Sequence, residues 1–352
     1  MKKWVTAVLA TIIAIIVVGT GVYVYKEYFA PIYQVSVVEI KNPNGTATIV
    51  NLSQSGSYIL TTTAPVNGVL VLNGEFSRVV SMVPSSTVTL YGLGDYGKVV
   101  GVDMYSTYPP PSAFRVPVLG DEETLPVEKI ANLSPQVVLS GEGFFSSSQI
   151  DQLVRGLGIP YLVMNPQSIG QIENQTVELA QLMGGLQNAT SINNWMNQSL
   201  QDIHSIITSN HLGGLSVFYY LDSQGGAWTA GNGTFINDYF QLLNATNIAT
   251  GYYYYIMSRE NITSENPSYI ILDHYVNTSA LTDNTSFSTL AAVKDHNYSV
   301  IPNDNYFNEP DFRVIYAIYW LGQQFYPEYV NISMVPKFPV SLQYPPGANL
   351  LS

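Results

Sequence analysis

The sequence predicts an α/β protein of two similar lobes, each with a mainly parallel central sheet, joined by one long α-helix and enclosing a ligand cleft. The first observation that predicts this fold is a sequence motif that occurs twice, called the repeated phrase below. Residues 128–139 read EKIANLSPQVVL and residues 260–272 read ENITSENPSYIIL. Each copy has the pattern of a short helix, a proline that ends it, and the apolar run of a buried parallel strand. Similar elements flank both copies in the same order. An accidental echo is the alternative, because this order of elements is common in α/β proteins.

The long helix is the next observation. Apolar residues recur at three- and four-residue spacing from Ile192 to Ile207, which is the pattern of an amphipathic helix. We expect it to span residues 188–212 and to join the lobes as a stiff spine. The N-terminal lobe would then occupy residues 78–187 and the C-terminal lobe residues 213–328.

The ends of the chain differ from this core. Residues 29–77 alternate apolar and polar side chains and contain Asn-Gly turns at positions 44 and 67, which predicts a β-hairpin stalk or platform. Residues 329–352 form a tail rich in Pro and Tyr that either wraps the surface or is mobile.

Composition limits the function and the cellular setting. The chain has 352 residues, 46% of them apolar, which is enough for two domains with sizeable cores. A net charge of -12 with only 11% charged residues leaves no basic surface, so nucleic acid is excluded as a partner. The absence of cysteine excludes disulfides, thiolate metal sites and a lipid-modified cysteine.

An uncharged apolar stretch lies near the N-terminus. The 22 residues from Trp4 to Tyr25 follow Lys2 and Lys3, and this length spans a bilayer. We therefore expect residues 1–28 to anchor the protein in the cytoplasmic membrane with the bulk outside the cell; a cleaved signal sequence is the alternative.

Glycan acceptor sequons are unusually frequent, since roughly four would be expected by chance. Their number predicts an exported glycoprotein. The thirteen asparagines are Asn44, Asn51, Asn132, Asn174, Asn188, Asn197, Asn232, Asn244, Asn261, Asn277, Asn284, Asn297 and Asn331.

Several segments together resemble a known family. Residues 78–86 (RVVSMVPSS), 101–110 (GVDMYSTYPP) and 157–160 (LGIP), with the first copy of the phrase, resemble the helical-backbone substrate-binding proteins of ABC importers. These proteins take up vitamin B12, ferric siderophores or haem. The resemblance covers residues 78–327 and, with the anchor and sequons, suggests an archaeal-type membrane-anchored glycoprotein. It implies a metal chelate bound between the lobes, an ABC permease and its ATPase as partners, and no cofactor of the protein itself.

The resemblance also implies roles for individual residues. The ligand contacts would be Pro84, Ser85, Ser86, Tyr105, Tyr108 and Glu142 on the first lobe, and Trp228, Tyr254, Asn305, Tyr306, Phe307 and Arg313 on the second. Glu128 and Glu260 would dock onto the permease, one from each lobe; stabilisation of a helix N-terminus is the alternative for either alone. For Arg313 the alternative is a structural salt bridge.

Two aromatic segments of the second lobe have different expected environments. Gly225 and Gly226 predict an exposed loop around Trp228, whereas the run from Tyr252 to Tyr255 is either a cleft segment or an amphipathic strand with one buried face.

Enzyme motifs are absent from the sequence: it has no Gly-x-Ser-x-Gly, phosphate loop or His-Glu-x-x-His. The four histidines, at positions 204, 211, 274 and 296, do not form a metal-ligand pattern, so we expect neither an enzyme nor a metal site. Scarce Lys and Arg argue against a strongly anionic ferric catecholate as ligand. A cell-surface glycoprotein with a structural or sensory role is the rival to a transport protein.

Overall fold

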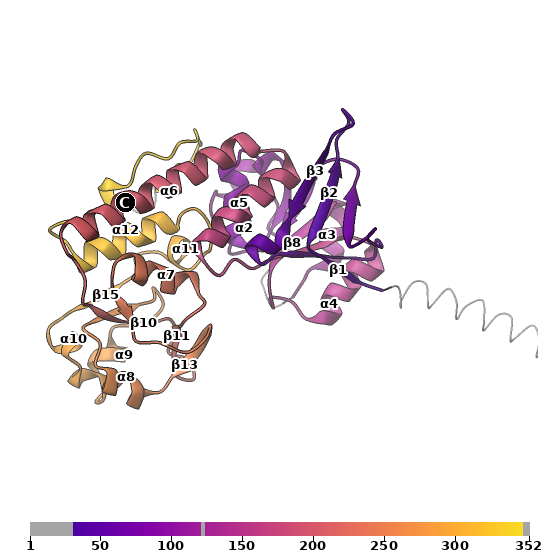
Figure 1. Ribbon diagram of the computed structural model, residues 1–352. Coiled ribbons are helices and arrows are strands. Elements are labelled where there is room, and N and C mark those ends of the chain that lie inside the picture. The colour runs from indigo at the N-terminus through magenta and orange to yellow at the C-terminus, as the bar shows by residue number, and fades with distance from the viewer. Residues whose placement is uncertain (1–30, 121–123, 348–352) are drawn as a thin grey trace, which may run out of the picture.

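The computed structural model describes residues 31–120 and 124–347, and shows two lobes side by side with a long helix lying along both (Figure 1). The candidate anchor at residues 1–28 lies outside this part of the chain. Within the described ranges, no helix is long and apolar enough to cross a membrane.

Each lobe contains four parallel strands in the same spatial order. In the first lobe the order is β7 (Val99–Val102), β6 (Val79–Ser81), β8 (Val137–Gly141) and β9 (Tyr161–Met164). In the second it is β12 (Thr246–Asn247), β10 (Ser216–Tyr220), β14 (Tyr269–Leu272) and β15 (Tyr298–Val300). Numbered along the chain, both sheets read second, first, third, fourth, and all these pairings are parallel. The expected pair of similar α/β lobes is confirmed by this shared topology.

The repeated phrase forms the same elements twice. It gives α3 (Val127–Leu133) before β8 and α8 (Arg259–Glu265) before β14. Each helix ends at a residue with left-handed backbone, Ser134 at φ 47° and Asn266 at φ 43°, and the proline follows directly. Proline disfavours a helical conformation in the preceding residue, so both helices end before it.

The segment before residue 78 is not a separate stalk. β1 (Tyr33–Val35) and β4 (Tyr58–Thr61) extend the first lobe's sheet as antiparallel strands beyond β9. β2 (Val37–Lys41), β3 (Ala47–Asn51) and β5 (Val69–Leu72) form a second, three-stranded sheet. Asn44-Gly45 turns the β2–β3 hairpin as expected, but β5 runs parallel to β2, so the turn at Asn67 makes no hairpin between β4 and β5.

The spine helix was expected at residues 188–212 and is observed as α6 at residues 186–209, so it begins two residues earlier and ends three residues earlier than expected. α5 (Ile169–Met183) and α6 (Leu186–Ser209) are separated at Gly184, whose φ of 93° glycine adopts without a steric cost. The apolar face of α6 is buried, and one continuous apolar core extends from β1 through α5, α6 and α12 (Val314–Phe325) to the tail.

The other helices flank the sheets or lie on loops. They are α2 (Pro84–Gly92), α4 (Ser147–Asp151), α7 (Phe235–Leu242), α9 (Ser279–Thr282), α10 (Ala291–Lys294) and α11 (Asp304–Phe307).

The tail packs across both lobes. The Trp195 indole of α6 donates a hydrogen bond to the Pro336 carbonyl at 2.8 Å, and Phe338 stacks on Phe312 with ring centroids 5.0 Å apart. Further along, the Tyr344 backbone N–H donates to the Tyr91 hydroxyl of the first lobe at 2.8 Å. The tail therefore wraps the surface and adds a second connection between the lobes.

Glu178 ties the segment before β4 to α5 from a buried position. Its Oε1 accepts a hydrogen bond from the Ser55 backbone N–H at 3.2 Å, and its Oε2 accepts one from the Ser55 hydroxyl. Burial raises the pKa of Glu178 to about 7, and the bonds from Ser55 oppose this rise. The folded protein thus holds a proton that the unfolded chain loses at lower pH.

Because the folded pKa of Glu178 lies above the unfolded one, its contribution to stability is present below the unfolded pKa and is lost as pH rises through about 7. We expect the free energy of unfolding to fall by up to about 3 kcal/mol over this interval, and Glu178→Gln to remove that part of the slope. Urea unfolding followed by tryptophan fluorescence measures it. Glu265→Gln, at an exposed glutamate, is the control for loss of one charge; an unchanged slope in Glu178→Gln would contradict the assignment.

Candidate cleft between the lobes

The carboxyl ends of the two parallel sheets face each other. Thr107, in the loop after β7, accepts a hydrogen bond at its hydroxyl from the Asn305 side-chain amide at 3.2 Å, and Asn305 lies on α11 after β15. At a second point, the Gln167 amide beyond β9 donates to the Tyr253 hydroxyl at 3.3 Å. Open parallel sheets bind ligands at this edge, so the space between the two contacts is the candidate site.

Exposed apolar side chains line this rim. Tyr105 is 48% exposed and Met104 50%, both after β7, and Phe144 after β8 is 37% exposed. A side chain at Gly141 would approach the Phe144 ring to 2.7 Å, so the glycine allows this ring to lie over the end of β8. The first lobe thus presents flat and flexible apolar groups to the cleft.

The second lobe contributes a two-stranded antiparallel sheet beside its parallel one. β11 (Ala227–Ala230) pairs with β13 (Tyr254–Met257) on the side of the lobe that faces its neighbour (Figure 1). Trp228 lies within β11 opposite Ile256 and is half-buried, so its expected place on an exposed loop is wrong. The exposed turn that Gly225 predicts lies just before it, at residues 223–225, and a side chain at Gly226 would meet Ile256 at 2.5 Å. The Trp228 indole N–H donates to the Gln224 carbonyl at 3.1 Å.

Tyr253, within the run from Tyr252 to Tyr255, is a rim residue that was not among the individually expected ligand contacts. It precedes β13, is 37% exposed, and has a φ of 63°, a left-handed conformation that is strained for an aromatic residue. Tyr254, which was expected to contact the ligand, is half-buried against the main core, and burial raises its pKa. The alternative of an amphipathic strand therefore fits Tyr254, while its neighbour reaches the other lobe.

A chain of polar side chains leads from Glu142 to Tyr253. The Asn165 amide donates to Glu142, the Gln167 amide donates to Asn165, and Gln167 also reaches the Tyr253 hydroxyl. Burial, and to a smaller extent the Glu142 carboxylate, raises the pKa of Tyr253, and the bond from Gln167 opposes this. Asn165 and Gln167 directly follow the apolar run of β9, a position in the sequence that could have identified them.

Five expected ligand contacts are buried, which corrects their assignment. Ser85 and Ser86 lie in the first turn of α2 after Pro84, and all three are buried, so a ligand cannot reach their side chains in this conformation. Tyr306 is 3% exposed. Phe307 is fully buried, with its ring centroid 5.3 Å from that of Tyr219 in β10.

Tyr108 and Arg313 belong to a buried cluster and not to the cleft surface. The Tyr108 hydroxyl donates to the Tyr344 carbonyl of the tail, and the Arg313 guanidinium lies 5.6 Å from the Tyr108 ring centroid. Arg313 pairs with Asp311 at 2.7 Å and also with Glu309. Burial raises the pKa of both carboxyl groups, and Arg313 opposes this rise. Of the two alternatives for Arg313, the structural salt bridge is therefore the one observed.

Removing this cation would leave two carboxyl groups buried without a partner. We expect Arg313→Gln to lower the free energy of unfolding by about 3–5 kcal/mol at neutral pH, and by less in acid, where protonation neutralises Glu309 and Asp311. Urea unfolding at neutral pH and in acid measures the two losses. Arg155→Gln breaks the more exposed pair with Asp151 and should cost under about 1 kcal/mol. An equal loss at both pH values for Arg313→Gln would contradict the assigned charges.

The segments that directly follow the eight parallel strands contain neither Lys nor Arg: residues 82–86, 103–110, 142–146, 165–168, 221–226, 248–254, 273–278 and 301–311. The loop after β7 continues beyond residue 110 to α3 and carries Arg115, which is exposed. Glu142, in the segment after β8, is exposed. No group of three or more metal-ligating side chains occurs within residues 31–120 and 124–347.

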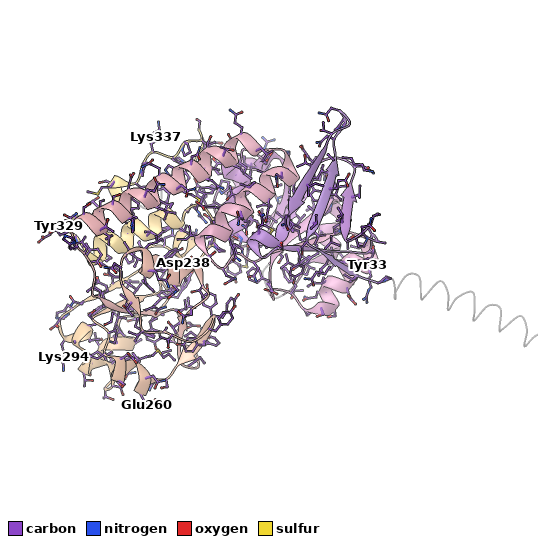
Figure 2. The ribbon with its side chains drawn as sticks, in the orientation of Figure 1. Tyr33, Asp238, Glu260, Lys294, Tyr329 and Lys337 are labelled. Carbon is purple, nitrogen blue, oxygen red and sulfur yellow. The ribbon has the colours of Figure 1, made fainter. Side chains whose placement is uncertain are left out.

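The two candidate docking glutamates are exposed on matching helices. Glu128 borders a groove of about 590 Å³ between α3 and α4. Glu260 lies at the end of the second lobe remote from α6 (Figure 2). The Ser258 side chain caps α8 by accepting from the Asn261 N–H, so Glu260 is not the capping residue.

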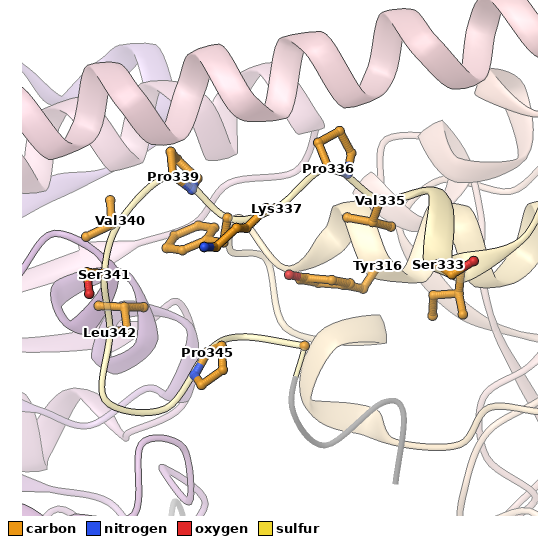
Figure 3. Close-up of a pocket in the computed structure, with 13 residues that line it drawn as sticks. Tyr316, Ser333, Val335, Pro336, Lys337, Pro339, Val340, Ser341, Leu342 and Pro345 are labelled. Atoms are coloured by element: carbon orange, nitrogen blue, oxygen red, sulfur yellow. The ribbon is translucent and has the colours of Figure 1, made fainter.

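A further cavity of about 680 Å³ lies beneath the tail, lined by Tyr316 and residues 332–347 (Figure 3). It is remote from the ends of the parallel strands, because tail segments and α12 form its walls. It therefore does not mark the cleft.

Comparisons with known proteins agree with this architecture. A family model described as periplasmic binding protein matches residues 79–305. The chain is 30% identical over 265 residues to an uncharacterized ABC transporter substrate-binding lipoprotein of Bacillus subtilis, covering 74% of this chain and 83% of that protein. It is 28% identical over 262 residues to a cobalamin-binding protein of Halobacterium salinarum, covering 71% and 69%.

Solved structures show the same fold. A periplasmic heme-binding protein from Pseudomonas aeruginosa matches with a TM-score of 0.63 at 21% identity, covering 76% of this chain and 96% of that one. A periplasmic vitamin B12 binding protein of Vibrio cholerae matches with a TM-score of 0.56 at 23% identity, covering 71% and 96%. By the extent of the family match and the identity to the Bacillus relative, the chain belongs to the periplasmic binding protein family.

Proposed function

We propose that this protein captures a metal-chelate nutrient outside the cell and delivers it to an ABC permease. The observation that carries the proposal is the pair of facing strand ends, which are bridged at Thr107–Asn305 and Gln167–Tyr253 and carry exposed aromatic groups. Flat aromatic walls suit a macrocycle or a chelate. The cobalamin- and heme-binding relatives support this class of ligand, and a solute-binding family supports a role without catalysis.

The ligand is neutral or cationic under this proposal. Haem propionates and ferric catecholates carry negative charges that need Arg or Lys partners, and the segments that directly follow the parallel strands contain none. Glu142, a carboxylate exposed on the rim, repels anions. Cobalamin or a neutral ferric siderophore therefore fits better than haem.

Binding measured by titration calorimetry with cobalamin, a ferric hydroxamate and haem tests this. Tyr105→Ala and Tyr253→Ala should each weaken binding of the preferred chelate at least about tenfold, or 1.4 kcal/mol, because they remove aromatic contacts from opposite lobes. Tyr329→Ala, at an exposed tyrosine remote from the cleft (Figure 2), should leave affinity unchanged. No saturable binding of any of the three would refute the chelate assignment, and tightest binding of haem would refute the charge argument.

Glu128 and Glu260 are the proposed permease contacts. They open the two copies of the repeated phrase, so one exposed carboxylate projects from each lobe at equivalent positions. Two acidic groups, one on each lobe, can bind two cationic side chains of a partner and set its orientation. We also propose that residues 1–28 keep the protein at the membrane beside that partner, with the parallel strands of the two lobes in residues 78–187 and 213–328.

Charge reversal separates docking from ligand binding. Glu128→Lys combined with Glu260→Lys should lower chelate uptake at least about tenfold in vesicles containing the permease and its ATPase, with ligand affinity unchanged. Glu265→Lys makes the same charge change elsewhere on α8 and should preserve uptake. Normal uptake by the double variant would show that these carboxylates do not dock.

A further inference from the structure

The structure sorts the sequons by the geometry of their asparagines. At five of them the side-chain oxygen accepts a hydrogen bond from the serine or threonine two residues on. Asn44 accepts from the Thr46 hydroxyl at 2.7 Å, and Asn51 from the Ser53 hydroxyl at 2.7 Å. The other three accept from the backbone N–H of that residue at 2.9–3.0 Å: Asn277, Asn284 and Asn331.

Four further sequons lie wholly inside helices, at Asn174, Asn188, Asn197 and Asn261, and a fifth begins at Asn132 in the last turn of α3 and ends at its C-terminal cap, Ser134. Residues two apart on a helix point to different sides, so the asparagine and its hydroxyl partner cannot be contacted together. Some of these amides are also engaged, because Nδ2 of Asn188 donates to the Leu93 carbonyl at 2.8 Å and that of Asn197 to the Asn193 carbonyl at 3.0 Å.

Two loop sequons are engaged in the same way. Nδ2 of Asn232 donates to the Thr250 carbonyl at 2.8 Å, and Nδ2 of Asn244 to the Leu212 carbonyl at 2.7 Å. A glycan on either nitrogen would replace one of its two amide protons and would lie against the carbonyl oxygen that the amide now contacts. Asn297 belongs to none of these groups.

N-glycosylation needs the amide nitrogen and the hydroxyl together. A bond forms between Nδ2 and the anomeric carbon of a glycan carried on a lipid phosphate or diphosphate. The sugar–phosphate bond breaks, its electron pair leaves with the phosphate, and the amide proton passes to a base. Recognition of the sequon hydroxyl beside the reacting amide is what makes the third position Ser or Thr.

We propose that Asn44, Asn51, Asn277, Asn284 and Asn331 are the glycan acceptors of the folded protein, and that the helical and engaged sequons stay bare. In the five acceptors the hydroxyl residue already lies beside the asparagine side chain, and four of the five are exposed, Asn284 being half-buried. The lipid-linked sugar can then reach them without unwinding a helix.

Asn51 shows what such a glycan would cover. It shares the outer face of the three-stranded sheet with Ile49, which is 56% exposed, and stands opposite Val37, which in turn pairs with Val69. A sugar on Asn51 would therefore lie over an apolar sheet face. Conversely, bare Asn132 and Asn261 leave the surface around Glu128 and Glu260 open, since each shares a helix with one glutamate.

Occupancy of every sequon, measured by mass spectrometry of peptides from the protein purified from the membranes of the cells that make it, tests the proposal. We expect glycopeptides at the five turn sites and at least about tenfold lower occupancy at the helical ones. Asn51→Gln should lower the mass of the intact protein by one glycan, whereas the matched Asn197→Gln should not. Equal occupancy of helical and turn sites would show modification before folding and overturn the proposal, as would a chain without glycans. Chelate binding does not depend on either result, so the transport proposal is tested separately.

Discussion

The packing of α6 against α5 and α12 is the constraint on which the rest of the structure depends. Its buried face contributes Ile192, Trp195, Met196 and Ile203 to one apolar core that continues through both lobes. Close-packed protein interiors resist deformation, and a helix packed into both lobes restricts their relative movement more than a pair of loose strands would. Recognition must therefore come from side chains already placed on the rim, with modest movement of the lobes.

Buried polar groups hold the second lobe's rim in place. Arg313, Asp311 and Glu309 form one cluster, and next to it Asn308 donates to the Asp273 carboxylate at 2.6 Å, which also accepts from Tyr219. Burying these charges is unfavourable unless each is paired and hydrogen-bonded. In this lobe each of these groups has an ion-pair or hydrogen-bond partner. The loop that carries Asn305 toward Thr107 is fixed as a result.

Much of the fold could be predicted because its determinants are local. Apolar spacing identified α6, and the repeated phrase identified α3, β8, α8 and β14. The site was less accessible, because roles there depend on contacts distant in sequence. Tyr108 is withdrawn from the cleft by a tail residue more than two hundred positions away, and Tyr253 reaches the rim through a backbone angle that no residue pattern encodes. A resemblance transfers positions, but it does not show which side chains the tail covers.

Six carboxyl groups with shifted pKa values bear on how the stability of this weakly charged chain depends on pH. Burial raises the pKa at every one of them: Asp103, Glu173, Glu178, Asp238, Glu309 and Asp311. Acid unfolds many proteins by protonating carboxylates whose pKa the fold has lowered. At the four that form no ion pair with Arg313, namely Asp103, Glu173, Glu178 and Asp238, the sign is opposite, because the fold already favours the protonated form and gains stability as pH falls. A chain with 11% charged residues then loses little stability in acid, and its polar surface of hydroxyls and amides does not titrate.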